Sequence, residues 1–170
     1  ISPKLEGDTE ALHGYIFDVG TPNQADLFTE TVKKLGSYAG RTYKEAQDIR
    51  RAIKDIDDVD IPMPTERSEI TNNTLREKIF DKDIDAWLKR ESIYRQNKSS
   101  MYLVILGQCT EAMKSKLESN GDFKTIADDS NVINLLKLIR NIAFAYESKR
   151  YPFLAVHTAV KNIYMNHQKH

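Results

Sequence analysis

Apolar residues recur every three to four positions along most of this chain, which is the pattern of amphipathic helices. A Thr-Pro pair at 21–22 is typical of a helix start, and the apolar face that follows it ends at Gly40. Thr42 and Glu45 have the spacing of a capping box, and a second apolar stripe follows over 46–56. Two helices are therefore predicted before residue 57.

The middle of the chain is predicted to hold a linker and two further helices. Two prolines and several acids within 57–70 disfavour a helix, so we expect a flexible linker there. The capping-box spacing recurs at 74–77, before a long helical pattern that the polar stretch 97–100 interrupts weakly. Another apolar face over 102–117 predicts the next helix.

The last third of the chain is predicted to hold two more helices. Residues 130–146 have apolar positions over a broad arc, so this helix should be the most buried one. A final helix is predicted to start at Pro152. The chain as a whole predicts an all-α bundle of about six helices, which form one helical domain over 21–170.

Strand character is confined to the front of the chain. Residues 14–20 are aromatic and β-branched between two glycines, and residues 4–6 are a candidate partner strand. We therefore interpret 1–20 as an N-terminal extension or a short β-hairpin. A lone hairpin is marginal in water, so it would have to dock on the helices.

The sequence carries no pattern that indicates catalysis or metal binding. Its seven glycines match neither phosphate-binding pattern, and Cys109 lies on an apolar stripe where a buried thiol is favoured over a nucleophile. The acids at 55–60 lack the glycine and the closing glutamate of a calcium loop, which favours a solvated segment. We therefore expect no enzymatic activity, no cofactor and no metal ion.

Two features of composition bear on where the protein works. The longest unbroken apolar stretch, 101–106, is far shorter than the roughly 20 residues that a membrane-spanning helix needs. The single cysteine cannot form an internal disulfide, which fits a reducing compartment. We therefore expect a cytoplasmic protein without a membrane partner.

Charge is balanced overall but divided along the chain. Twenty-five basic residues match 25 acids, which argues against a whole-domain nucleic-acid binder. Residues 137–170 nevertheless hold six basic residues and one acid, a net +5 that leaves −5 over 1–136. Such polarity can orient contacts between copies of the chain or direct one end towards a polyanion. The candidate contact residues, including two aromatic residues that flank a proline, are Lys137, Arg140, Lys149, Arg150, Tyr151, Phe153 and Lys161.

Seven short stretches resemble a known family in their order and residues. They are KLEG at 4–7, LHGYIFD at 12–18, QADLF at 24–28, YAGRTY at 38–43, LGQCT at 106–110, LLKLIR at 135–140 and KRY at 149–151. With them the chain resembles the start of Gag polyproteins from copia-type LTR retrotransposons, particularly those of unicellular algae.

This resemblance implies a fold like the N-terminal domain of retroviral and retrotransposon capsids. It also implies a structural protein that self-associates in the cytoplasm into a virus-like shell around the element's RNA. In the family a second capsid domain, and often a zinc knuckle, follow downstream, so we expect RNA to be bound by that downstream region. The residues alone leave one alternative open, a helical nucleic-acid-binding or protein-interaction module that uses the basic C-terminal helices, with an affinity for nucleic acid that falls steeply with salt.

Overall fold

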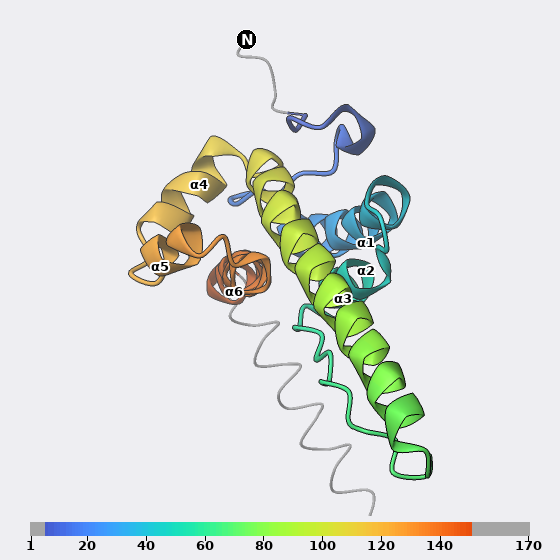
Figure 1. Ribbon diagram of the computed structural model, residues 1–170. Helices are drawn as coiled ribbons and strands as arrows, with labels where there is room; N and C mark the ends of the chain where they lie inside the picture. The colour runs from blue at the N-terminus through green and yellow to red at the C-terminus, as the bar shows by residue number, and fades with distance from the viewer. Residues whose placement is uncertain (1–5, 151–170) are drawn as a thin grey trace, which may run out of the picture.

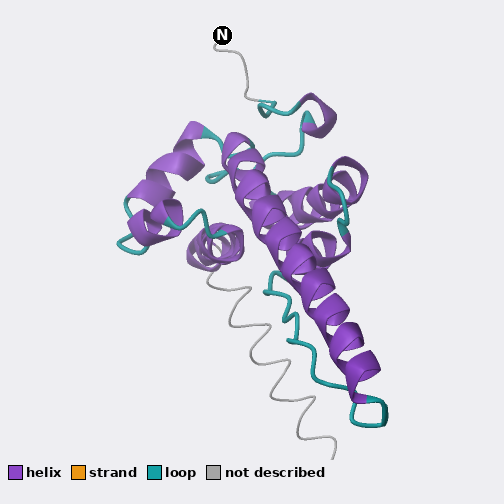
Figure 2. Ribbon diagram, viewed as in Figure 1, coloured by secondary structure: helices purple, strands orange, loops and turns teal. Residues whose placement is uncertain are grey.

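The long helix α3 (Asn73–Gly107) runs through the computed structural model (Figure 1), which describes the backbone of residues 6–150 and the side chains of 6–145. A short 3-10 helix, Glu10–Leu12, comes first in the chain. The other helices are α1 (Gln24–Thr42), α2 (Gln47–Asp55), α4 (Glu111–Glu118), α5 (Phe123–Asp128) and α6 (Val132–Arg150). Figure 2 shows no strand within 6–150, so the all-α prediction is confirmed for that range. The helix predicted from Pro152 lies outside the described residues.

The helices share one hydrophobic core. In the view of Figure 1, α1 and α2 lie on one side of α3, and α4, α5 and α6 lie on the other. Helix α6 packs against both α1 and α3, and α4 and α5 pack against α6. Its broad apolar arc is buried, as predicted, with Leu135, Leu136 and Ile139 fully inaccessible to solvent. None of the described helices is long and apolar enough to cross a membrane.

The predicted starts of the first two helices are wrong. Helix α1 begins at Gln24, and the hydroxyl of Thr21 is buried without a hydrogen-bond partner in the described part of the chain. Thr42 is the last residue of α1 instead of the cap of α2, which begins after Ala46 without a side-chain cap. The hydroxyl of Thr42 cannot cap α2 because the backbone of Thr42 still belongs to α1.

The start of α3 also differs from the prediction. The carboxamide oxygen of Asn72 accepts a hydrogen bond from the backbone N–H of Leu75 at 3.0 Å, so Asn72 caps the helix in place of the box at 74–77. An asparagine cap satisfies an orphan N–H as well as a threonine does.

Helix α3 continues through the polar stretch 97–100, where an interruption was expected. Asn97 is buried, and its side-chain amide donates a hydrogen bond to the backbone oxygen of Lys44 at 3.1 Å. The chain breaks instead after Gly107, and Thr110 caps α4 by accepting from the N–H of Met113. The helix predicted over 102–117 is thus divided between α3 and α4, and α5 was not predicted.

The N-terminal segment pairs with the end of α3. The N–H of Phe17 donates to the oxygen of Gln108 at 2.8 Å, and the N–H of Thr110 donates to the oxygen of Phe17 at 3.0 Å. Within the described residues the stretch 14–20 forms only an isolated bridge, between Phe17 and Cys109, and no strand. Lys4 and Leu5 of the predicted partner strand lie outside the described residues.

The segment expected to be a flexible linker lies along α3 (Figure 1), and we call residues 57–72 the strap. Its Ile61 is buried and accepts a hydrogen bond from the indole nitrogen of Trp87 at 2.9 Å. The N–H of Val59 donates to the Tyr94 hydroxyl at 3.1 Å, and that hydroxyl donates to Asp58. The strap is therefore attached to α3 by both apolar burial and hydrogen bonds.

Acid is expected to weaken this attachment through Asp58. Burial acts to raise the pKa of Asp58, but hydrogen bonds from Tyr94 and Lys98 outweigh it, so the pKa lies below the ordinary 3.8. A lowered pKa in the folded state stabilises the fold above pH 3.8, and this contribution is lost as the pH falls through the lower value. Fluorescence of Trp87, the only tryptophan, should shift to longer wavelength in that acid range.

The matched control for this prediction is Asp58→Asn, which removes the titrating group. The difference in stability between wild type and this variant should shrink as the pH falls below 3.8. A difference that stays constant with pH would show that Asp58 does not hold the strap through its charge.

Candidate functional site

Helices α1, α2 and α6 border a groove of about 610 Å³ that combines an apolar floor with basic side chains. We call it the cationic groove. Its apolar residues are Phe28, Val32, Ile56 and Phe144, and its basic residues are Lys33, Arg50, Lys54 and Arg140.

The exposed aromatic ring of Phe144 lies in the cationic groove and is held in place by the buried rings of Phe28 and Phe17. Phe144 is 45% exposed, and its ring meets Phe28 edge-on with centroids 5.9 Å apart. Phe28 in turn lies 5.5 Å from the fully buried ring of Phe17. An exposed ring with such support loses little conformational freedom on binding, which is typical of contact residues in interfaces.

The basic residues of the groove have no acidic partner inside the described part of the chain. Among residues 6–145, whose side chains the structure describes, no ion pair involves Lys33, Arg50, Lys54 or Arg140. Arg50 and Lys54 are four residues apart on α2, a spacing at which like charges cost a helix a few tenths of a kcal/mol. This arrangement favours an acidic group from outside.

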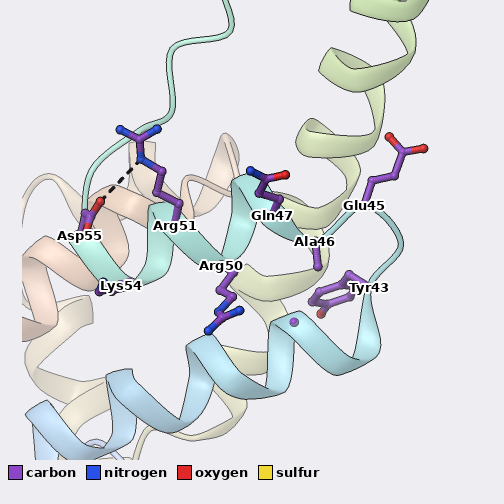
Figure 3. A pocket seen from close by; sticks show the side chains of 9 residues that line it. Tyr43, Glu45, Ala46, Gln47, Arg50, Arg51, Lys54 and Asp55 are labelled. Carbon is purple, nitrogen blue, oxygen red and sulfur yellow. Dashed lines mark ion pairs between the residues drawn. The ribbon is translucent and has the colours of Figure 1, made fainter.

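A second hollow of about 670 Å³ adjoins the first and shares Arg50 and Lys54 with it (Figure 3). In Figure 3, Arg50 points from α2 towards α1, whereas Arg51 points away and forms an ion pair with Asp55 at 3.8 Å. The two neighbouring arginines therefore differ in role, because Arg51 has its charge matched by Asp55, whereas Arg50 forms no ion pair among the side chains that the structure describes.

The structure places one of the predicted contact residues in the groove. Arg140 is exposed and lines it, whereas Lys137 forms an ion pair with Asp57 of the strap at 3.2 Å. The side chains of Lys149 and Arg150, at the end of α6, and all of Tyr151, Phe153 and Lys161 lie outside the described residues, so their contact role stays a prediction.

Sequence reasoning missed most of the groove. Lys33, Arg50, Lys54 and Phe144 were not among the predicted contact residues. The only local signal is the spacing of Arg50 and Lys54, which places two like charges on one face of α2. Nothing in the sequence indicates that this face meets α1 and α6.

Three features of the described residues bear on chemistry: the cysteine, the most buried ion pair and the clustering of potential metal ligands. Cys109 is fully buried, as predicted, and burial raises the pKa of its thiol to about 12, which disfavours the reactive thiolate. The buried carboxylate of Asp48 accepts two hydrogen bonds of 2.7 Å from Arg90, which joins α2 to α3. No group of three or more potential ligands within 6–150 is placed to hold a metal ion.

The described part of the chain is thus a helical domain with a cationic, partly aromatic groove. The chain matches no protein-family model, no curated protein and no solved structure.

Proposed function

We propose that this chain is a structural protein whose work is self-association, the capsid region of a Gag polyprotein from a copia-type LTR retrotransposon. In that role it forms, in the cytoplasm, a shell that packages the element's RNA. The proposal rests on the family-like stretches along 4–151 and on the helical fold.

One structural observation carries the part of the proposal that concerns contacts. The cationic groove places four cations, which form no ion pair among the described side chains, around an exposed, supported phenyl ring. Arginine and aromatic side chains are enriched in protein interfaces, and apolar surface rimmed by polar groups is typical of them. The groove is therefore a surface suited to bind another protein chain.

Each individual contact in a shell can have a low affinity. Repeated contacts between different patches close into rings when the rotation between subunits permits it. Many weak contacts together hold a shell because each further contact is formed at high effective concentration. A groove of this size is therefore compatible with such a role.

The test is the state of association of the chain as a function of its concentration. We expect the average mass in sedimentation velocity to rise with concentration, and electron microscopy to show rings or capsomer-like particles. Charge reversal at Lys149, Arg150 and Lys161 is expected to lower that mass. A mass that stays monomeric across all concentrations and salt conditions would refute self-association.

The alternative, a nucleic-acid-binding module, makes a different prediction in the same samples. For each phosphate that the protein neutralises, its affinity for RNA would fall by roughly one logarithmic unit per tenfold rise in salt concentration. We expect no such binding by this chain at physiological salt. A monomeric chain that binds RNA tightly would replace the proposal by this alternative.

A further inference from the structure

The N-terminal half of α3 carries a row of acids on the part of the helix that projects beyond α1 and α2 (Figure 1). Glu77, Asp81 and Asp85 are exposed and follow one another at intervals of four residues. Leu88, 52% exposed, follows three residues later. Residues at these intervals lie on one face of a helix, and we call these four residues the acidic stripe.

The strap leaves the acidic stripe open. The strap binds α3 through Asp83, which pairs with Arg67, and through Trp87, and both lie on a different face of the helix from the stripe. Among the side chains of 6–145, no ion pair involves Glu77, Asp81 or Asp85. Like charges four residues apart weaken a helix slightly. Lys78 and Lys82 are exposed three residues before Asp81 and Asp85, but neither forms an ion pair with them. The carboxylates of the stripe therefore have no ion-pair partner among the described side chains, as is true of the cations of the groove.

We propose that the acidic stripe of one copy binds in the cationic groove of the next. The three carboxylates face four cations, and Leu88 supplies an apolar side chain for the exposed ring of Phe144. This inference rests on the proposed self-association and names its two surfaces. Because the stripe and the groove are different patches of the same chain, the contact is heterologous and propagates into a ring or a filament.

Charge favours the acidic stripe as the occupant of the groove over two other candidates, the chain's own C-terminal segment and RNA. Residues 151–170 contain Lys161 and Lys169 and no acid, so the chain's own C-terminal segment would meet like charge in the groove. RNA would meet a domain in which 25 acids exceed 22 basic residues over 6–150. An acidic, partly apolar helix face matches both the cations and the floor, and the chain itself provides one.

The test uses two double variants of the full 170-residue chain. Arg50→Glu with Lys54→Glu reverses the groove, and Asp81→Lys with Asp85→Lys reverses the stripe. Each variant alone is expected to weaken self-association at least about tenfold, because like charges then face each other across the contact. An equimolar mixture of the two variants should associate again, since a reversed groove then meets a reversed stripe.

The matched control, Arg95→Glu with Lys116→Glu, reverses two other exposed cations that form no ion pair among the described side chains. It makes the same change in net charge as the groove variant and should leave association within about twofold of wild type. Circular dichroism of every variant checks that the helices are intact.

The outcomes separate this inference from the proposed function. A wild-type chain that stays monomeric refutes the proposed function. A wild-type chain that associates, with a groove variant no weaker than the control or with a mixture that fails to recover, refutes only the stripe-in-groove contact. Binding of an RNA oligonucleotide by wild type that the groove variant loses would also overturn it, because the groove would then be an RNA site.

Discussion

Replacing Gln108 by leucine is expected to lower the free energy of unfolding by about 3 kcal/mol. The Gln108 side chain is fully buried between the end of α3 and the N-terminal segment. Its amide nitrogen donates to the backbone oxygens of Leu12 at 3.0 Å and Tyr15 at 2.8 Å, and its oxygen accepts from the N–H of Thr9 at 3.1 Å. Leucine has a similar size but leaves all three backbone groups without this partner.

The measurement is urea unfolding of the Gln108→Leu variant beside Gln96→Leu, a matched control on the exposed surface of α3. The control should change stability by less than about 0.5 kcal/mol. Hydrogen exchange gives a second readout, because the amide of Thr9 should lose protection only in Gln108→Leu. Equal stability of the two variants would mean that water replaces the glutamine at no cost.

Truncation of Leu136 to alanine is expected to cost about 3 kcal/mol, a large part of the stability of a domain of this size. Leu136 lies on α6 and is fully buried in the core that all the main helices share. Alanine removes apolar contacts and leaves a cavity, because the surrounding helices can relax only in part.

Leu103→Ala provides the comparison for this substitution. Leu103 lies on α3 and is 68% exposed, so the same change in chemistry should alter stability by less than about 0.5 kcal/mol. Thermal or urea unfolding of the two variants measures the difference. Similar losses of unfolding free energy in the two variants would show that Leu136 of α6 does not belong to the core.

The helical content of 6–150 could be predicted from the sequence because a helix that buries one face must repeat apolar residues every three to four positions. Residues 132–143 repeat apolar side chains over a broad arc, and the structure buries that arc in the core. Helix ends were predicted less well because a residue with a capping side chain can also continue the preceding helix, and the local sequence does not decide between the two conformations. Thr42 had the right neighbours for a cap, yet its backbone continues α1 to its last turn.

Breaks in the long helix depended on partners far away in the chain. The polar stretch 97–100 was expected to interrupt the helix weakly, and its Asn97 is a residue type that often competes for backbone groups. Its side chain bonds to Lys44 instead, 53 residues earlier, which leaves α3 intact. The real break after Gly107 positions Gln108 and Cys109 against the N-terminal segment, some 90 residues away in sequence.

The candidate site was predictable only in its residue types. The sequence by itself determined that the chain would be helical, that charge would be unevenly divided and that Cys109 would be buried, because all three depend on local composition and periodicity. Only the tertiary structure decided that Lys33, Arg50 and Arg140 would border one groove, because α6 must first pack against α1, far from it in sequence, on the shared core. It likewise decided which cations are neutralised, since Lys137 forms an ion pair with Asp57, whereas Arg140, less than one turn further along the same helix, forms none among the side chains of 6–145.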